Sequence, residues 1–117
     1  MSATETSGVG IEPERVAAWL LEDSALQLVD VREPYEREAG HIAESRHIEL
    51  TTLPSQAATL DAERPVVLYC RVGARSAMAA QALRAAGFEA YSMDGGLLRW
   101  AEEQRPLEPS DGRVAEH

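Results

Sequence analysis

The chain has 117 residues, 44% hydrophobic and 26% charged, which is the composition of one ordinary globular domain with no apolar run long enough to span a membrane. Its 20 acidic residues outnumber 11 basic residues, all arginine, and the net charge of −9 disfavours nucleic acid and anionic membranes as partners. A single cysteine excludes an internal disulfide bond, and because the N-terminus lacks a secretory pattern we expect a cytoplasmic protein.

Apolar periodicity divides the first third of the chain into three elements. They are a short strand at residues 9–11, a helix at residues 13–22 and a strand at residues 25–31. The helix has a proline in its first turn and repeats apolar residues at Val16, Trp19 and Leu20, so one of its faces should pack on the core. Residues 1–8 are small and polar, and we expect them to be disordered.

Polar residues follow the second strand at its carboxyl end, the end that faces the ligand crevice in open α/β sheets. Asp30 and Arg32 are therefore candidates either for catalysis or for a structural charge network. In the structural alternative, Arg32 pairs with Asp30, Glu33 or Glu36. His41 has the same two alternatives, since it is either a general base or a residue whose ring nitrogen ties a loop to a backbone carbonyl.

The middle of the chain carries weaker patterns. A helical turn over residues 34–39 begins with a proline and is followed by a glycine. Residues 48–50 are expected to form an edge strand. Residues 51–60 predict a helix with Thr51 or Thr52 as its N-terminal cap.

The most informative stretch is a strand, a loop and a helix around the one cysteine. Residues 66–69 are an uncharged run that is typical of a strand buried on both faces. Cys70 follows, and Gly73 lets the loop curl so that backbone N–H groups point inward. An alanine-rich helix over residues 76–86, closely packed through residues such as Met78, brings its positive dipole end to the same place. This setting favours a reactive thiolate, whereas the alternative is an inert, buried thiol.

The rest of the chain predicts one strand, one helix and a tail. The strand covers residues 88–93, and glycines 95–96 form a tight turn that permits positive φ and close backbone approach. Trp100 should dock the last helix, which closes by residues 105–106, and residues 107–117 form an extended tail. Strands alternate with helices throughout, which predicts an α/β fold with a mainly parallel five-stranded sheet and helices on both faces.

Three stretches of the chain resemble the signatures of rhodanese-type sulfurtransferases. Their active-site loop, Cys-Arg-x-Gly-x-Arg-Ser, is similar to Cys70-Arg71-Val72-Gly73-Ala74-Arg75-Ser76. Residues 28–36, with Gly-His-Ile at 40–42, resemble the upstream signature, and residues 94–100 resemble the downstream Gly-Gly-x-x-x-Trp. The resemblance covers residues 9–106 and implies one rhodanese domain of the thiosulfate sulfurtransferase type.

The resemblance also implies an activity and a set of site residues. The expected enzyme moves a sulfane sulfur from thiosulfate or a persulfide donor to a thiol, cyanide or protein acceptor, through a persulfide on Cys70, without metal or organic cofactor. The residues expected to bind substrate are Arg71, Val72, Gly73, Ala74, Arg75 and Ser76. The residues expected to form a structural charge network are Asp30, Arg32, Glu33 and His41. A monomer or weak homodimer is expected.

Several alternatives stay open at this point. Arg71 and Arg75 either hold the sulfonate end of the donor or pair with acidic residues, and Ser76 either bonds to the sulfur or caps the helix. Phosphatases and arsenate reductases of the same fold place five residues between cysteine and arginine. This chain has four, which should form a smaller cup that suits one sulfur atom. A sulfur-carrier or regulatory binding module is the remaining alternative. Mercaptopyruvate is the less expected donor, because the loop lacks the Cys-Gly-Ser-Gly-Val-Thr pattern.

Overall fold

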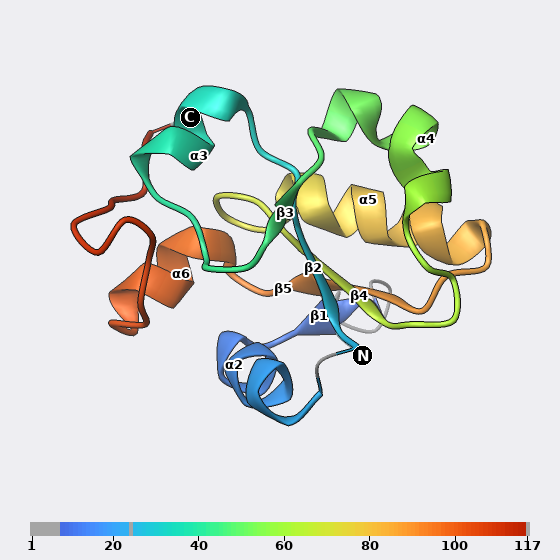
Figure 1. Ribbon diagram of the computed structural model, residues 1–117, viewed down its shortest axis with the longest axis horizontal. Helices are drawn as coiled ribbons and strands as arrows, with labels where there is room; N and C mark the ends of the chain where they lie inside the picture. Colours follow the sequence, from blue (N-terminus) through green and yellow to red (C-terminus); the bar gives the residue numbers. More distant parts are fainter. Residues whose placement is uncertain (1–7, 24, 117) are drawn as a thin grey trace.

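A five-stranded parallel sheet with the order β1-β5-β4-β2-β3 forms the centre of the protein (Figure 1). The structure is a computed structural model that describes residues 8–23 and 25–116, so most of the N-terminal segment expected to be disordered lies outside the described residues. The strands are β1 (Gly10–Ile11), β2 (Gln27–Asp30), β3 (Arg46–His47), β4 (Val66–Tyr69) and β5 (Ala90–Met93). The predicted α/β fold with a parallel sheet is confirmed.

Helices cover both faces of this sheet (Figure 1). The helices are α2 (Pro13–Glu22), α3 (Pro34–Ala39), α4 (Leu53–Gln56), α5 (Ala74–Ala85) and α6 (Gly96–Glu102), with 3-10 turns η1 (Leu50–Thr52) and η2 (Ala57–Thr59). One core cluster lies under α4 and α5, and the other lies under α2 and α6. Among the described residues, no helix has both the length and the apolar character that crossing a bilayer requires.

Strand β4 lies in the middle of the sheet and is buried on both faces. All four of its residues are buried, and alternate side chains enter opposite core clusters. Val66 and Leu68 join the cluster under α5, while Val67 and Tyr69 join the cluster under α2 and α6. Because successive strand residues point to opposite faces, an unbroken apolar run is the pattern that such a central strand needs.

The middle of the chain differs from the sequence predictions. The edge strand is β3, Arg46–His47, rather than residues 48–50, which lie past the strand although the amide of Ile48 still donates to the carbonyl of Asp30 at 3.0 Å. The helix predicted over residues 51–60 is wrong, because the segment is divided into η1, α4 and η2. Pro54 has no N–H to donate to the preceding turn. Thr52 occupies the N-cap position of the short helix α4, but its hydroxyl donates to the carbonyl of Glu49 and makes no side-chain cap bond.

Two details of α5 also differ from prediction. The helix begins at Ala74, two residues earlier than predicted, with Gly73 as its N-terminal cap. Met78, expected to pack closely, is 62% exposed. At the other end of the chain, Trp100 is buried as predicted and its indole N–H donates to the carbonyl of Pro106 at 2.8 Å.

Candidate active site

The loop between β4 and α5 places Cys70 at the positive end of a helix. The first N–H groups of α5 have no partner within the helix, so this end carries a partial positive charge. Gly73 adopts φ 110°, and its N–H donates to Sγ of Cys70 at 3.0 Å. The cysteine residue is 1% exposed. The sulfur therefore lies under the loop with a backbone amide directed at it, rather than in a purely apolar setting.

A buried pair of serines lies beside the sulfur. The hydroxyl of Ser76 is 3.5 Å from Sγ of Cys70 and 2.8 Å from the hydroxyl of Ser92 on β5. The Ser76 hydroxyl also lies 3.3 Å from the carbonyl of Gly73. Gly73 occupies the cap position, so the geometry corresponds to a sulfur contact by Ser76 and not to a helix cap.

Helix α6 supports the loop from behind. The amides of Leu97 and Leu98 donate to the carbonyls of Cys70 and Arg71 at 2.8 and 2.9 Å. Gly96 permits this contact, because a Cβ at that position would overlap the Arg71 carbonyl and lie 2.7 Å from the carbonyl oxygen of Cys70. The downstream Gly-Gly turn therefore holds the backbone of the cysteine loop.

The two arginines of the loop have different partners. Arg75 donates from both terminal nitrogens to the two carboxylate oxygens of Glu36, at 2.8 and 2.9 Å. Arg71 donates from Nε to the carbonyl of Ala115 at 3.2 Å. Hydrogen bonding to Glu36, which exceeds the opposing effect of burial, raises the pKa of Arg75. One arginine thus pairs with an acidic residue, and the other contacts the C-terminal tail.

That tail runs along α3 to the loop, and we name residues 107–116 the C-terminal strap. His41 and Glu108 exchange two backbone hydrogen bonds of 3.0 and 2.7 Å. The amide of Arg113 donates to the carbonyl of Ala39 at 2.7 Å, and Ala115 is buried. The strap thus ends against the Arg71 side chain. The sequence predicts an extended tail packed across the surface at Leu107 and Val114, and both side chains do pack against the core cluster under α2 and α6.

Asp30 and Arg32 form a buried ion pair. Nε and Nη2 of Arg32 donate to the two oxygens of Asp30 at 2.9 and 2.8 Å, and Nη2 also donates to the carbonyl of Gly40. Both side chains are 0% exposed. Arg37 adds a second cation at 3.3 Å from Asp30. The two side chains therefore bind each other, and Arg32 also ties this pair to the backbone that follows α3.

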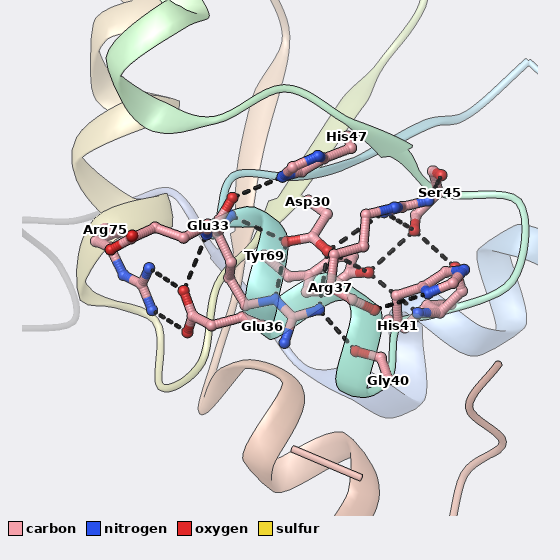
Figure 2. Close-up of polar contacts among 12 residues, drawn as sticks. Asp30, Glu33, Glu36, Arg37, Gly40, His41, Ser45, His47, Tyr69 and Arg75 are labelled. Carbon is pink, nitrogen blue, oxygen red and sulfur yellow. Dashed lines mark hydrogen bonds and ion pairs between the residues drawn. The ribbon is translucent and has the colours of Figure 1, made fainter. Parts of the chain in front are cut away.

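The remaining network candidates, His41 and Glu33, and the nearby His47 make hydrogen bonds around α3 (Figure 2). His41 Nδ1 lies 3.2 Å from the carbonyl of Arg37, and His47 Nε2 lies 2.7 Å from the carbonyl of Arg32. The amide of Glu33 donates to Oε1 of Glu36 at 2.9 Å. In the part of the chain that the structure describes, no group of three or more His, Cys, Asp or Glu side chains is arranged to hold a metal ion.

Sequence reasoning missed several residues that complete this region. They are Arg37, Ser45, Tyr69 and Ser92, together with Glu36 as the partner of Arg75. The hydroxyl of Tyr69 accepts from the amide of Ile42 and lies 3.0 Å from the Ser45 hydroxyl. Burial, with the nearby charge of Asp30, raises the pKa of Tyr69 to about 12. No local pattern marks Tyr69, Ser92 or the Glu36–Arg75 pair, because their contacts join elements far apart in the sequence, whereas Arg37 lies only seven and eight residues from Asp30 and Ser45.

Comparisons with known proteins agree with this architecture. The model of the rhodanese-like domain matches residues 12–103. A thiosulfate sulfurtransferase GlpE of Stutzerimonas stutzeri is 37% identical over 102 residues, which cover 86% of this chain and 88% of GlpE. The probable adenylyltransferase/sulfurtransferase MoeZ of Mycobacterium tuberculosis is 36% identical over 90% of this chain, which spans only 28% of the length of MoeZ. A crystal structure of a rhodanese-related protein from Thermoplasma volcanium superposes with a TM-score of 0.78 at 30% identity, over 84% of this chain and 95% of that one.

Proposed function

Because the chain belongs to the family of rhodanese-like domains, we propose that it is a sulfurtransferase in which Cys70 carries the transferred sulfur as a persulfide. The observation that carries the proposal is the 3.0 Å hydrogen bond from the amide of Gly73 to Sγ of Cys70 at the N-terminal end of α5. A backbone donor in this position stabilises a sulfur anion, and the helix dipole acts in the same direction.

The proposed reaction has two half-reactions. The Cys70 thiolate attacks the outer sulfur of thiosulfate, a new S–S bond forms, and the S–S bond of thiosulfate breaks to release sulfite. The negative charge of the thiolate then resides on the terminal sulfur of the persulfide. In the second half-reaction an acceptor thiolate or cyanide attacks that terminal sulfur, and Cys70 leaves as a thiolate. Neither half-reaction consumes an oxidant or a reductant.

The residues of the loop have separate roles in this mechanism. The Gly73 amide and the Ser76 hydroxyl lie within reach of the sulfur, at 3.0 and 3.5 Å, and would stabilise it as an anion. Arg71, whose Nε donates to a strap carbonyl at 3.2 Å, is the better placed of the two arginines to bind the sulfonate end of a donor. Val72, Ala74 and Arg75 would shape the rest of the cup.

The state of Arg75 favours sulfur transfer over phosphate chemistry. A phosphatase of this fold would need its loop arginine to donate both terminal nitrogens to the oxyanion. Here Glu36 already accepts from both of these nitrogens, with its own carboxylate 0% exposed. A tetrahedral oxyanion would have to share this arginine with a buried carboxylate, whereas a single sulfur atom need not.

The mass of the protein tests the proposal. Incubation of the reduced protein with thiosulfate should add one sulfur atom, about 32 Da, and cyanide should then remove it. Cys70→Ala should gain no mass under the same conditions, while Ser110→Ala, a change at an exposed position of the strap, should gain it like the wild type. An unchanged mass for folded wild-type protein would overturn the persulfide mechanism.

Kinetics separate the enzyme from a sulfur carrier. If thiosulfate is the working donor, single-turnover loading should be half-saturated at about 1 mM thiosulfate or below, within the usual range of KM values of about 1 μM to 1 mM. Loading that rises linearly far beyond this range would favour a carrier that receives its sulfur from a protein persulfide.

A further inference from the structure

Ser92 is a buried serine on β5 whose hydroxyl lies next to that of Ser76. The sheet holds its backbone from two sides, because it pairs with Gly10 of β1 and with Leu68 of β4. Its side chain lies on the same face of the sheet as Ala90, which belongs to the core cluster under α5. Ser92 is 3% exposed, so its hydroxyl needs a partner within the protein.

The two serine hydroxyls share a small set of acceptors at the start of α5. They are 2.8 Å apart, and either of them can donate to the other. Both also lie near the carbonyl of Gly73, Ser76 at 3.3 Å and Ser92 at 3.5 Å. The Ser76 hydroxyl in addition lies 3.5 Å from Sγ of Cys70. The direction of the short bond between the serines therefore decides which groups receive a proton.

Each hydroxyl has one proton to donate, which leaves two arrangements. If Ser76 donates to Ser92, the Ser76 hydroxyl cannot donate to the sulfur. If Ser92 donates to Ser76, the proton of Ser76 stays free for Sγ of Cys70 or for the carbonyl of Gly73.

The second arrangement is the one that a thiolate on Cys70 selects. The carbonyl of Gly73 already accepts from the amide of Ala77 at 3.0 Å, so it does not depend on a serine for a partner. A thiolate is the stronger acceptor, because a hydrogen bond to a charged group is stronger than one to a neutral group. The proton of Ser76 is therefore directed to the sulfur when the proton of Ser92 is directed to Ser76.

Resting on the proposed function, we propose that Ser92 is a positioning residue that directs the Ser76 hydroxyl at the sulfur of Cys70. Ser92 donates to Ser76, and Ser76 donates to Sγ at the two points of the reaction where Cys70 is a thiolate, before it attacks the donor and as it leaves the persulfide. Neither serine loses its proton, and only hydrogen bonds change. The Ser76 hydroxyl thereby acts on the same atom as the Gly73 amide, which lies 3.0 Å from it.

Single-turnover loading with thiosulfate, followed by mass spectrometry, tests the proposal. At saturating thiosulfate, Ser92→Ala should load about threefold more slowly than the wild type, less than the loss of about tenfold for Ser76→Ala, because Ser76 keeps its hydroxyl without the alignment. The thiosulfate concentration for half-maximal loading should stay the same, since Ser92 acts through Ser76 and not on the donor. Tyr91→Phe removes a hydroxyl from the adjacent residue of β5, whose side chain packs on the opposite core cluster, and should load like the wild type.

The double variant Ser76→Ala/Ser92→Ala separates alignment from packing. If Ser92 acts through Ser76, the double variant should load at the rate of Ser76→Ala alone. A further loss by the factor that Ser92→Ala shows in the wild-type background would overturn the proposal, because Ser92 would then act independently of Ser76.

The single variant and the wild type complete the test. A Ser92→Ala rate equal to that of the wild type would also overturn the role of Ser92, and thermal midpoints should show that each variant is folded. The mass gain of the wild type decides the proposed function separately. If the wild type gains a sulfur atom and the serine variants fail the expectations above, only the role of Ser92 is lost.

Discussion

Glu36 and Arg75 form a two-point ion pair that joins α3 to the first turn of α5. Both hydrogen bonds are short, 2.8 and 2.9 Å, and the residues are 39 positions apart in the sequence. The Glu36 carboxylate is 0% exposed, whereas the Arg75 side chain is 22% exposed. The pair therefore fixes the cysteine loop to the segment that carries the upstream signature, and it couples stability of the fold to the shape of the site.

Glu36→Gln should weaken the fold through this pair. The amide keeps the shape of the carboxylate but accepts at only one atom, which leaves one donor of Arg75 without its charged partner. We expect the free energy of unfolding to fall by about 1.5–3 kcal/mol, the usual contribution of a hydrogen bond to a charged group. Urea denaturation measures the change. Glu38→Gln, an exposed change on the same helix, should have little effect.

The same variant should change how stability depends on pH. Burial raises the pKa of Glu36, but hydrogen bonds from Arg75 and from the amide of Glu33 outweigh it and hold the pKa below its ordinary value of 4.5. A depressed pKa in the folded state contributes stability above the unfolded pKa, and that contribution is lost as the pH falls. The stability difference between wild type and Glu36→Gln should therefore narrow as the pH drops below 4.5. A difference in the free energy of unfolding that stays constant as the pH falls would contradict the lowered pKa of Glu36.

The sequence alone located the cysteine loop but not its supports. Cys70, Gly73 and the following helix are consecutive, so their local pattern was enough to predict an amide directed at the sulfur. The partner of Arg75 was not predicted, since Glu36 reaches it only after α3 and α5 pack at the same edge of the sheet. The Ser92 contact has the same origin, because it depends on the pairing of β4 with β5.

Ser76→Ala should slow sulfur transfer while the protein remains folded. It removes the side-chain hydroxyl at 3.5 Å from Sγ, which would stabilise the sulfur anion beside the Gly73 amide. Because the contact is long, we expect a loss of about tenfold in the rate of persulfide formation, below the 10²–10³ typical of a well-placed oxyanion donor. Single-turnover mass spectrometry measures it. Ser92→Ala touches Ser76 but not the sulfur, so it should cost less, and an equal loss in both variants would point to packing instead.

Gly96→Ala should destabilise the protein more than the same substitution at another glycine with positive φ, and it should also disturb the cysteine loop. Gly96 has φ 62°, and a Cβ there would overlap the backbone of Arg71 and Cys70. Gly87→Ala is the matched control, since Gly87 has φ 99° but a Cβ there would meet nothing within 4 Å. We expect Gly87→Ala to cost about 1–2 kcal/mol of conformational strain and Gly96→Ala to cost more. Only Gly96→Ala should also reduce persulfide formation, which kinetics with thiosulfate would reveal.

The fold was largely readable from the sequence because its strong signals are local. Proline in the first turn, helical spacing in residues 13–22 and the uncharged run of β4 each predicted the element that the structure contains. Residues 48–50 were wrongly predicted as a strand, since a short segment with apolar residues on either side of a charged one looks the same whether it pairs in a sheet or lies beyond the end of a strand. Met78 misled it as well, because an apolar residue in an alanine-rich helix carries no sign that it is 62% exposed.

Tyr69 should make the fold sensitive to alkaline pH. Burial, followed by the charge of Asp30, raises the pKa of Tyr69 from 10.0 to about 12, so the neutral phenol contributes stability below pH 10 that is lost as the pH rises toward 12. Tyr69→Phe should cost about 1–3 kcal/mol at neutral pH, because Ile42, Ser45 and Asp30 lose a partner. The difference in the free energy of unfolding between wild type and Tyr69→Phe should shrink as the pH rises above 10. Absorbance of tyrosinate should show that one phenol fewer ionises in folded Tyr69→Phe than in the wild type.

The C-terminal strap should limit how freely Arg71 binds a donor. Ala115 is 6% exposed, so Ala115→Glu cannot keep its place and should lift the end of the strap from the loop. The Nε atom of Arg71 would lose the Ala115 carbonyl at 3.2 Å and become free to bind the sulfonate of thiosulfate. We expect faster hydrogen exchange at the amide of Arg113, which now donates to Ala39, together with a lower KM for thiosulfate. Asp111→Glu, an exposed change on the same strap, should alter neither measurement. Faster hydrogen exchange with an unchanged KM for thiosulfate would show that Arg71 holds the strap and does not bind the donor.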